Sequence, residues 1–157
     1  MSNDVRVKSA AGFAGRLIAG RILPGTDLIT GIEKICEEHG VKGGWVNCLG
    51  SLQKAGYFIL EPNNSKLGAG YGEMLKVAGP VELMGGMGLI CYQDGQVGVH
   101  FHATMCDKEG KVFGGHLVKG ENPSLATVEL AINEIVDITM QRAHDEEADG
   151  NHFSPLK

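Results

Sequence analysis

Three of the six histidines in this sequence lie close together, between positions 100 and 116. His100 and His102 are separated by a single residue, and His116 follows the pair Gly114-Gly115. Neutral imidazole is the commonest metal ligand among the side chains. Three imidazoles that leave a fourth position for water are typical of catalytic zinc sites. That chemistry requires a fold that brings the three rings to one point.

The segment between the histidines predicts a β-hairpin. Asp107 and Lys111 can close a three-residue loop in which Gly110 takes the left-handed conformation that follows a type I turn. The loop fixes the register of the two strands, and that register gives the hairpin one apolar face. The pairs on this face are Met105 with Phe113, Ala103 with Gly115, and Phe101 with Leu117.

The same register places all three histidines on the opposite face, because strand side chains alternate. His116 lies directly across from His102, and a slip of one residue would separate them. We therefore predict that His100, His102 and His116 bind one divalent metal. Zinc suits this ligand set best, but cobalt, nickel, copper and iron also accept imidazole, so spacing does not choose the element. The alternative is that these are solvent-facing or hydrogen-bonded histidines on the outer side of a sheet.

The length of the chain indicates a single domain. A chain of 157 residues can bury about two thirds of its extended surface on folding. We expect the ordered domain at residues 11–143, between a flexible N-terminus at 1–10 and a flexible acidic tail at 144–157.

The cysteines and the apolar runs indicate the compartment. Cys36, Cys48, Cys91 and Cys106 are scattered without a C-x-x-C motif, and the N-terminus has no signal-peptide pattern. No apolar run approaches the roughly 20 residues of a membrane span. We expect a cytoplasmic protein that does not enter the membrane.

The net charge of −5 argues against unaided binding to nucleic acid, because an acidic surface repels phosphate. Arg16 and Arg21 come closest to a basic cluster, and they are most simply two solvated strand residues. Distant basic residues can still meet in a fold or an oligomer, so DNA binding stays open. If it occurs, we expect it to be weak and non-specific, with a shallow dependence on salt.

Turn and periodicity signals predict an α+β fold, with one mostly antiparallel sheet and at least one covering helix. Thr26 or Asp27 can cap this helix, and Gly40 is a left-handed stop after His39. His39 would complement the helix dipole, so we give it no metal role. The predicted strands, which include the two strands of the hairpin, span residues 14–22, 44–49, 53–60, 74–77, 81–92, 96–106 and 111–118.

Three segments allow more than one interpretation. Residues 125–140 fit both a strand and a helix, and we favour a strand up to Ile135. The sequence Leu-Gly-Ser-Leu at 49–52 is most simply a turn between two strands, although its amides could line a pocket. The sequence Gly-Gly-Met-Gly at 85–88 lies inside a predicted strand and indicates a bulge or tight packing.

Several short motifs together resemble the PPC domain, the plant and prokaryote conserved domain. The resemblance extends over residues 14–136, and its most diagnostic part is His100-Phe-His-Ala103 with Gly114-Gly-His-Leu117. It implies an antiparallel sheet flanked by helices, assembly as a homotrimer, and a metal at the three histidines. The other motifs are Leu23-Pro-Gly-Thr-Asp-Leu28, Leu49-Gly-Ser-Leu52, Gly110 and Thr127-Val-Glu-Leu-Ala-Ile132.

The resemblance also bears on function. Members of this family are commonly described as candidate DNA-binding proteins, and in plants the domain accompanies an AT-hook. This chain has no Arg-Gly-Arg-Pro hook, so the description as a DNA-binding protein applies to it only weakly. The hairpin alone is also similar to acetolactate decarboxylase, where His-x-His and a following Gly-Gly-His hold zinc. This second similarity, which covers only the hairpin, supports the metal and, more weakly, an enzyme.

Three functions are consistent with the sequence. They are a metal-binding homotrimer with a regulatory or DNA-associated role, a zinc-dependent lyase or hydrolase acting on a small oxygenated metabolite, and a trimer with a structural metal. Structural zinc usually has four protein ligands, so three favour an open site. In an enzyme, Glu129 or Glu82 could move a proton, and Arg21 could orient a small anionic ligand. Each of these three residues is more simply explained as an ordinary surface side chain.

Overall fold

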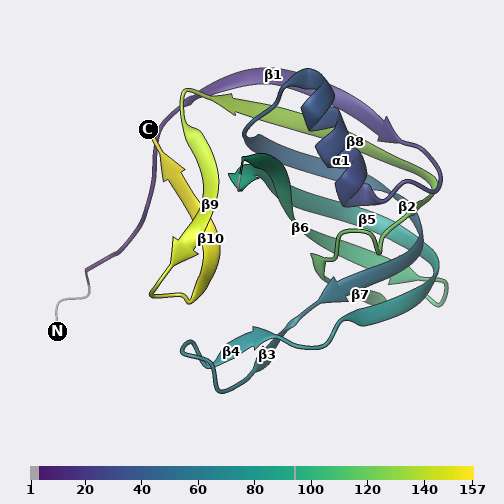
Figure 1. Ribbon diagram of the computed structural model, residues 1–157. Coiled ribbons are helices and arrows are strands. Elements are labelled where there is room, and N and C mark those ends of the chain that lie inside the picture. The colour runs from purple at the N-terminus through teal and green to yellow at the C-terminus, as the bar shows by residue number, and fades with distance from the viewer. Residues whose placement is uncertain (1–3, 94) are drawn as a thin grey trace.

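The computed structural model describes residues 4–93 and 95–157, and it is built mainly of β-strands. Figure 1 shows a long curved sheet with one helix lying against a face of it. Residues 1–3, part of the predicted flexible N-terminus, lie outside the described residues. The elements are β1 (Phe13–Ile22), α1 (Leu28–His39), β2 (Gly44–Phe58), β3 (Leu60–Pro62), β4 (Ala69–Tyr71), β5 (Leu75–Gln93), β6 (Gln96–Asp107), β7 (Val112–Leu117), β8 (Ser124–Val136), β9 (Thr139–Asp145) and β10 (Gly150–Leu156).

The main sheet has eight strands in the order β1-β8-β2-β7-β6-β5-β9-β10, and β3 and β4 form a separate hairpin. Strand β2 pairs with β8 along its first part and with β7 at Tyr57 and Phe58, while its other edge pairs with β5. Because β5 pairs with β6 and β6 with β7, the strands β2, β5, β6 and β7 form a closed circuit. We call these four strands the strand circuit, and it is the part of the fold that carries the histidines.

The helix forms where the sequence predicts it. The side chain of the N-cap Asp27 accepts a hydrogen bond of 3.0 Å from the Thr30 backbone N–H, which satisfies one of the free donors of the first turn. Gly40 ends the helix with φ of 64°, and His39 lies in the last turn. Both predicted ends of this helix are therefore confirmed.

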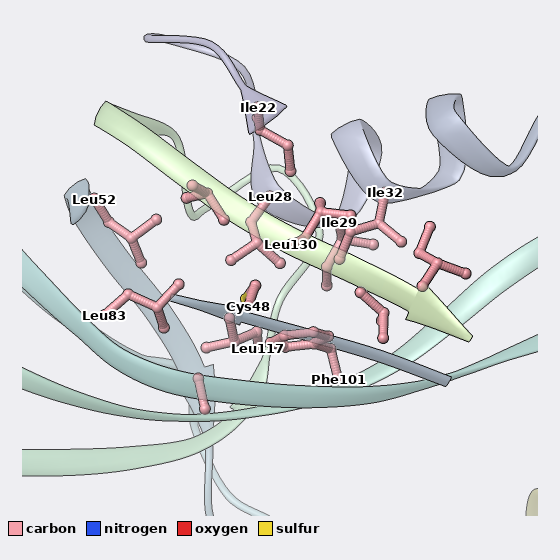
Figure 2. Packing of buried hydrophobic residues seen from close by; sticks show 14 of the residues in the cluster. Ile22, Leu28, Ile29, Ile32, Cys48, Leu52, Leu83, Phe101, Leu117 and Leu130 are labelled. Carbon is pink, nitrogen blue, oxygen red and sulfur yellow. The ribbon is translucent and has the colours of Figure 1, made fainter. Parts of the chain in front are cut away.

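The core lies between the helix and the sheet. Figure 2 shows Leu28, Ile29 and Ile32 of α1 directed toward the strands, where Phe101 and Leu117 belong to the same buried cluster. Phe101 is fully buried and lies against Gly86 and Gly88 of β5, where any Cβ would overlap its ring. The register of β5 against β6 shifts between Leu83 and Gly85, as expected at a bulge. Both the bulge and the tight packing predicted for residues 85–88 are present.

Two predictions about the elements need correction. The sheet is largely antiparallel as expected, but α1 is the single helix among residues 4–93 and 95–157, so helices in the plural do not flank it. Residues 49–52 are not a turn, because they lie within the continuous strand β2, whose register shifts at Gly50. The glycine therefore supplies a bulge in place of a corner. Residues 125–135 lie in β8, which confirms the strand that we favoured.

The C-terminal residues form a β-hairpin, β9 and β10, which the sequence analysis did not predict. The acidic residues that suggested a tail make its turn, since the Asp145 carboxylate accepts hydrogen bonds from the backbone N–H groups of Glu147 and Ala148. Arg6 and Lys8 pair with Glu147 and Asp145. Strand structure thus continues past residue 143, and the N-terminal segment lies against this hairpin, as Figure 1 also indicates. No helix in the described part of the chain has the length and apolar character needed to cross a membrane.

Candidate metal centre

The hairpin that carries the histidines forms in the predicted register. Gly110 has φ of 80°, and the Asp107 backbone N–H donates to the Lys111 carbonyl at 3.1 Å. The Asp107 carboxylate also accepts hydrogen bonds from the N–H groups of Glu109 and Lys111, which holds the loop closed. Strands β6 and β7 then pair His102 directly opposite His116. Local turn chemistry therefore determines which side chains meet.

Two glycines before His116 allow β7 to lie between its neighbours. A Cβ on Gly114 would overlap the Ala103 carbonyl oxygen of β6, and one on Gly115 would overlap the Phe58 carbonyl oxygen of β2. The backbone of β7 therefore approaches both strands more closely than a larger residue permits. This close approach lets β7 pair with both strands, and the register then places the His116 ring on the same face as His100 and His102.

The three imidazoles converge. The Nε2 atoms of His100 and His102 are 3.1 Å apart, and Nδ1 of His116 lies 3.4 Å from Nε2 of His102. One ligand nitrogen from each ring lies within 4.8 Å of the others. Two nitrogens bound to one tetrahedral zinc at about 2.0–2.1 Å are about 3.3–3.4 Å apart, so the distances from His102 to each of the other two rings are close to those expected around a shared ion.

The surroundings favour the neutral, ligating form of two of these rings. Burial lowers the pKa of His100 to about 4, and the positive charge of Arg142 and the neighbouring His116 and His102 act in the same direction. Burial likewise lowers the pKa of His116, again with His102 and Arg142 contributing. A neutral imidazole keeps a lone pair for a metal, so these shifts prepare the site for a cation at neutral pH.

An aromatic wall lies beside the histidines. The ring of Tyr71, at the end of β4, lies 4.9 Å from that of His116. The Phe58 ring of β2 stacks on the same Tyr71 ring, with 5.5 Å between the ring centroids. The β3–β4 hairpin thus packs against the face of the sheet that carries the three histidines, and it restricts the orientation of His116.

A pocket of about 370 Å³ opens beside His100 and His116. Its ionisable side chains besides these histidines are Glu33, Lys119, Arg142 and the thiol of Cys91, whose pKa is raised by burial. Glu33 and Lys119 form an ion pair with each other. The lining also contains Ile29, Phe58, Val99 and Leu117, so the pocket combines an apolar wall with a few charged groups.

The other candidates from the sequence lie elsewhere. Glu129 is exposed on β8, opposite Arg21 of β1, and neither residue lines this pocket. Arg21 donates to the Thr127 hydroxyl at 3.0 Å. Glu82 lies opposite Cys106, which is four residues and about 13 Å along β6 from His102. The structure therefore brings together the three histidines but none of these three charged residues with them.

Sequence reasoning missed the charged groups that do lie beside the histidines. Arg142 comes from β9, and His152 of β10 lies close enough to contribute to the low pKa of His100. Arg142, His152 and Tyr71 also line a neighbouring pocket of about 530 Å³. No motif or spacing links these positions to residues 100–116, because the connection is made only by the folded C-terminal hairpin.

Comparison with known proteins gives a consistent assignment. The sequence profile of the Plants and Prokaryotes Conserved (PCC) domain, the PPC domain named above, matches residues 9–136. Among curated proteins, the chain is 28% identical over 101 residues to the bifunctional protein GlmU of a Synechococcus strain. The match takes in 64% of this chain but only 14% of that much longer protein.

Solved structures with the same fold span nearly the whole chain. A plant- and prokaryote-conserved protein of Pyrococcus horikoshii superposes with a TM-score of 0.80 and 24% identity, over 96% of this chain and 99% of that one. A metal-containing protein of Archaeoglobus fulgidus gives 0.79 and 22%, over 95% and 99%. A candidate DNA-binding protein of Bacteroides thetaiotaomicron gives 0.75 and 18%, over 91% and 96%.

Proposed function

The chain belongs to the PCC domain family, and from that premise we propose that it is a metal-binding member in which His100, His102 and His116 hold one zinc ion. The observation that carries the proposal is the convergence of three imidazole nitrogens within 4.8 Å of one another. Three nitrogen donors suit zinc, and they also accept cobalt, nickel, copper or iron. The similarity in fold to a metal-containing protein of Archaeoglobus fulgidus supports the proposal.

The open position of the ion gives the site a chemical role. When bound, zinc with three protein ligands can polarise a carbonyl group or activate a water molecule. His100 and His116, which are half-buried, and His102, which is exposed, would hold the ion. The aromatic ring of Tyr71 limits access next to His116. A pocket beside the histidines supports a site that takes a ligand and disfavours a purely structural metal.

Two roles follow from such a site. A zinc-dependent lyase or hydrolase acting on a small oxygenated metabolite is supported by the pocket and its charged groups. A regulatory or DNA-associated role is supported by the description of similar structures as candidate DNA-binding proteins. The charge of −5 limits how many phosphates one chain can neutralise, so a DNA-associated role would depend on further partners or on an assembled surface.

We also propose a homotrimer located in the cytoplasm. Exposed apolar side chains on the outer face of β2 and β5 support assembly, since such patches mark interaction sites. All four cysteines are unpaired thiols, as expected in a reducing compartment. The apolar residues with the largest exposure on these strands are Trp45, Leu49, Met84 and Met87.

Metal analysis of histidine variants tests the proposed function. The parent protein, reconstituted with zinc and freed of excess metal, should contain one zinc per chain by elemental analysis. His102→Ala should lose most of the affinity, because two nitrogens hold zinc much more weakly than three. His39→Ala and His144→Ala are matched controls outside the cluster and should keep full occupancy. A parent without metal, or equal occupancy in His102→Ala, would falsify the site.

A further inference from the structure

The pocket beside the histidines has an uncompensated positive charge. Of its charged side chains, Glu33 and Lys119 form an ion pair and balance each other. Arg142 is the remaining charged side chain of the lining, and no partner in the pocket balances it. A divalent ion on the three histidines would add to this positive charge. Electrostatics therefore favour an anion in the pocket.

Arg142 is held in place without being neutralised. Its Nη2 atom donates to the Asn151 carbonyl of the paired strand β10, which orients the guanidinium with a neutral acceptor. Within residues 4–93 and 95–157, no carboxylate forms an ion pair with it. A guanidinium has five N–H donors in a planar fork, so one bond to Asn151 leaves several for a ligand.

We propose that the pocket binds the carboxylate of a small organic acid, with Arg142 as the cationic residue that anchors it beside the metal face. This inference rests on the proposed metal function. The planar fork of the guanidinium can donate to both oxygens of a carboxylate at once. The side chains of Ile29, Phe58, Val99 and Leu117 offer an apolar wall for a short hydrocarbon portion. A volume of about 370 Å³ limits the ligand to a small molecule.

Calorimetric titration of the zinc-loaded protein with lactate tests the anion site by binding and not by activity. Lactate carries one carboxylate, and the neighbouring hydroxyl oxygen can bind a metal ion. Lactamide is its neutral counterpart. The parent should bind lactate but not lactamide. In Arg142→Gln the dissociation constant for lactate should rise about 10- to 100-fold, the usual effect of losing a charge-assisted hydrogen bond. Arg142→Lys keeps the charge without the fork and should show a smaller rise.

Controls separate this site from a general charge effect and from misfolding. Arg21→Gln removes an arginine that lies outside the pocket and should leave lactate binding unchanged. Thermal unfolding verifies that each variant is folded, and partial recovery in Arg142→Lys shows that the loss in Arg142→Gln is not structural. Equal lactate affinity in the parent and Arg142→Gln would overturn the site. Tighter binding of inorganic phosphate than of lactate by tenfold or more would overturn the assignment to a carboxylate.

Metal content, measured on every sample, distinguishes the two proposals. One zinc per chain together with lactate binding that ignores Arg142 leaves the metal function standing and refutes the anion site. A parent that binds no zinc refutes the metal function. Lactate titration of that same metal-free protein then still decides the anion site: weaker binding in Arg142→Gln than in the parent supports it, and equal binding in the two, or no binding by the parent, refutes it.

Discussion

The three imidazoles share one face of a hairpin but differ in their exposure. His102 is exposed, whereas His100 and His116 are half-buried against Arg142 and the aromatic side chains around them. Burial penalises the protonated ring, so the two partly buried rings resist protonation and stay available as ligands. The same resistance means that the folded protein binds fewer protons here than the unfolded chain does.

We expect the metal-free protein to lose stability as the pH falls below about 6.5. The pKa of His100 is lowered from 6.5 to about 4 by folding, so between these values the unfolded chain binds the proton more readily. The free energy of unfolding therefore decreases as pH drops through this window. Urea unfolding at pH 6.5 and pH 5.0 measures the difference, which should be smaller in His100→Gln.

The choice of pH avoids a second titration. Hydrogen bonds from Arg16 lower the pKa of Glu134 from 4.5 to about 2, and the stability from that carboxylate is lost only as the pH falls below 4.5. Measurements at pH 5.0 and above therefore report mainly on the histidines. Equal pH dependence in the parent and His100→Gln would contradict the role of His100.

At the scale of elements, the sequence predicted best where one turn determines the pairing. The β6–β7 hairpin could be predicted because Gly110 sets the loop and alternation then sorts apolar residues from histidines. The β9–β10 hairpin could not, because its acidic turn looks like a solvated tail and its link to the sheet is one parallel pair, Tyr92 with Gln141. The convergence of the three histidines was therefore predictable, while the position of Arg142, which depends on that link, was not.

Glycines in strands were ambiguous for a related reason. A glycine between two apolar runs can end a strand or bulge it, and the difference depends on which strand passes alongside. Gly50 lies where a Cβ would overlap the Thr127 carbonyl of β8, so only the pairing with β8 explains it. The sequence alone does not show which strand lies beside Gly50, so it could not distinguish a bulge from a turn.

Asn122 joins several elements, and we expect Asn122→Ala to reduce the free energy of unfolding by about 2–4 kcal/mol. Its fully buried side chain accepts from the Gly56 N–H at 3.1 Å and donates to the carbonyls of Gly56 and Val118 at 3.1 and 2.7 Å. Its backbone N–H donates to the cap residue Asp27 at 3.0 Å. Alanine would leave the backbone N–H and carbonyl groups of Gly56 and the carbonyl of Val118 without these hydrogen bonds.

Urea denaturation of the metal-free protein measures this effect. Asn47→Ala is the matched control, because Asn47 is exposed on β2, the strand that Asn122 contacts at Gly56, and should change stability by less than about 0.5 kcal/mol. Similar losses for the two variants would show that the Asn122 network is not the junction that we describe.

At the scale of the whole molecule, the outer face of β2 and β5 is unusually apolar for a surface. Trp45, Leu49, Met84 and Met87 are 43%, 56%, 56% and 58% exposed, and they lie on neighbouring antiparallel strands. Burying such side chains against another copy would contribute roughly 25 cal/mol per Å² of apolar area. This face is therefore where we expect the proposed trimer to assemble.

We expect Met84→Glu to dissociate the trimer, because a buried carboxylate without a partner is costly at an apolar interface. Light scattering coupled to gel filtration should report three times the chain mass of 16.7 kDa for the parent and a smaller species for the variant. Leu23→Glu introduces the same charge at a residue that is 58% exposed at the end of β1, and it should leave the mass unchanged. A parent that runs as a stable monomer would contradict the trimer.

The two sides of the anion pocket are fastened to the protein unequally. His100, His102 and His116 stand on β6 and β7, where each strand of the strand circuit has hydrogen-bonded neighbours on both sides. Arg142 stands on β9, whose partner β10 is the last strand of the sheet and pairs on one side only among the residues that the structure describes. A small displacement of this hairpin would open the pocket on the side where the Arg142 guanidinium lies, without moving the three histidine nitrogens. In the proposed site, a ligand would then be able to enter and leave while a metal stays bound to the histidines.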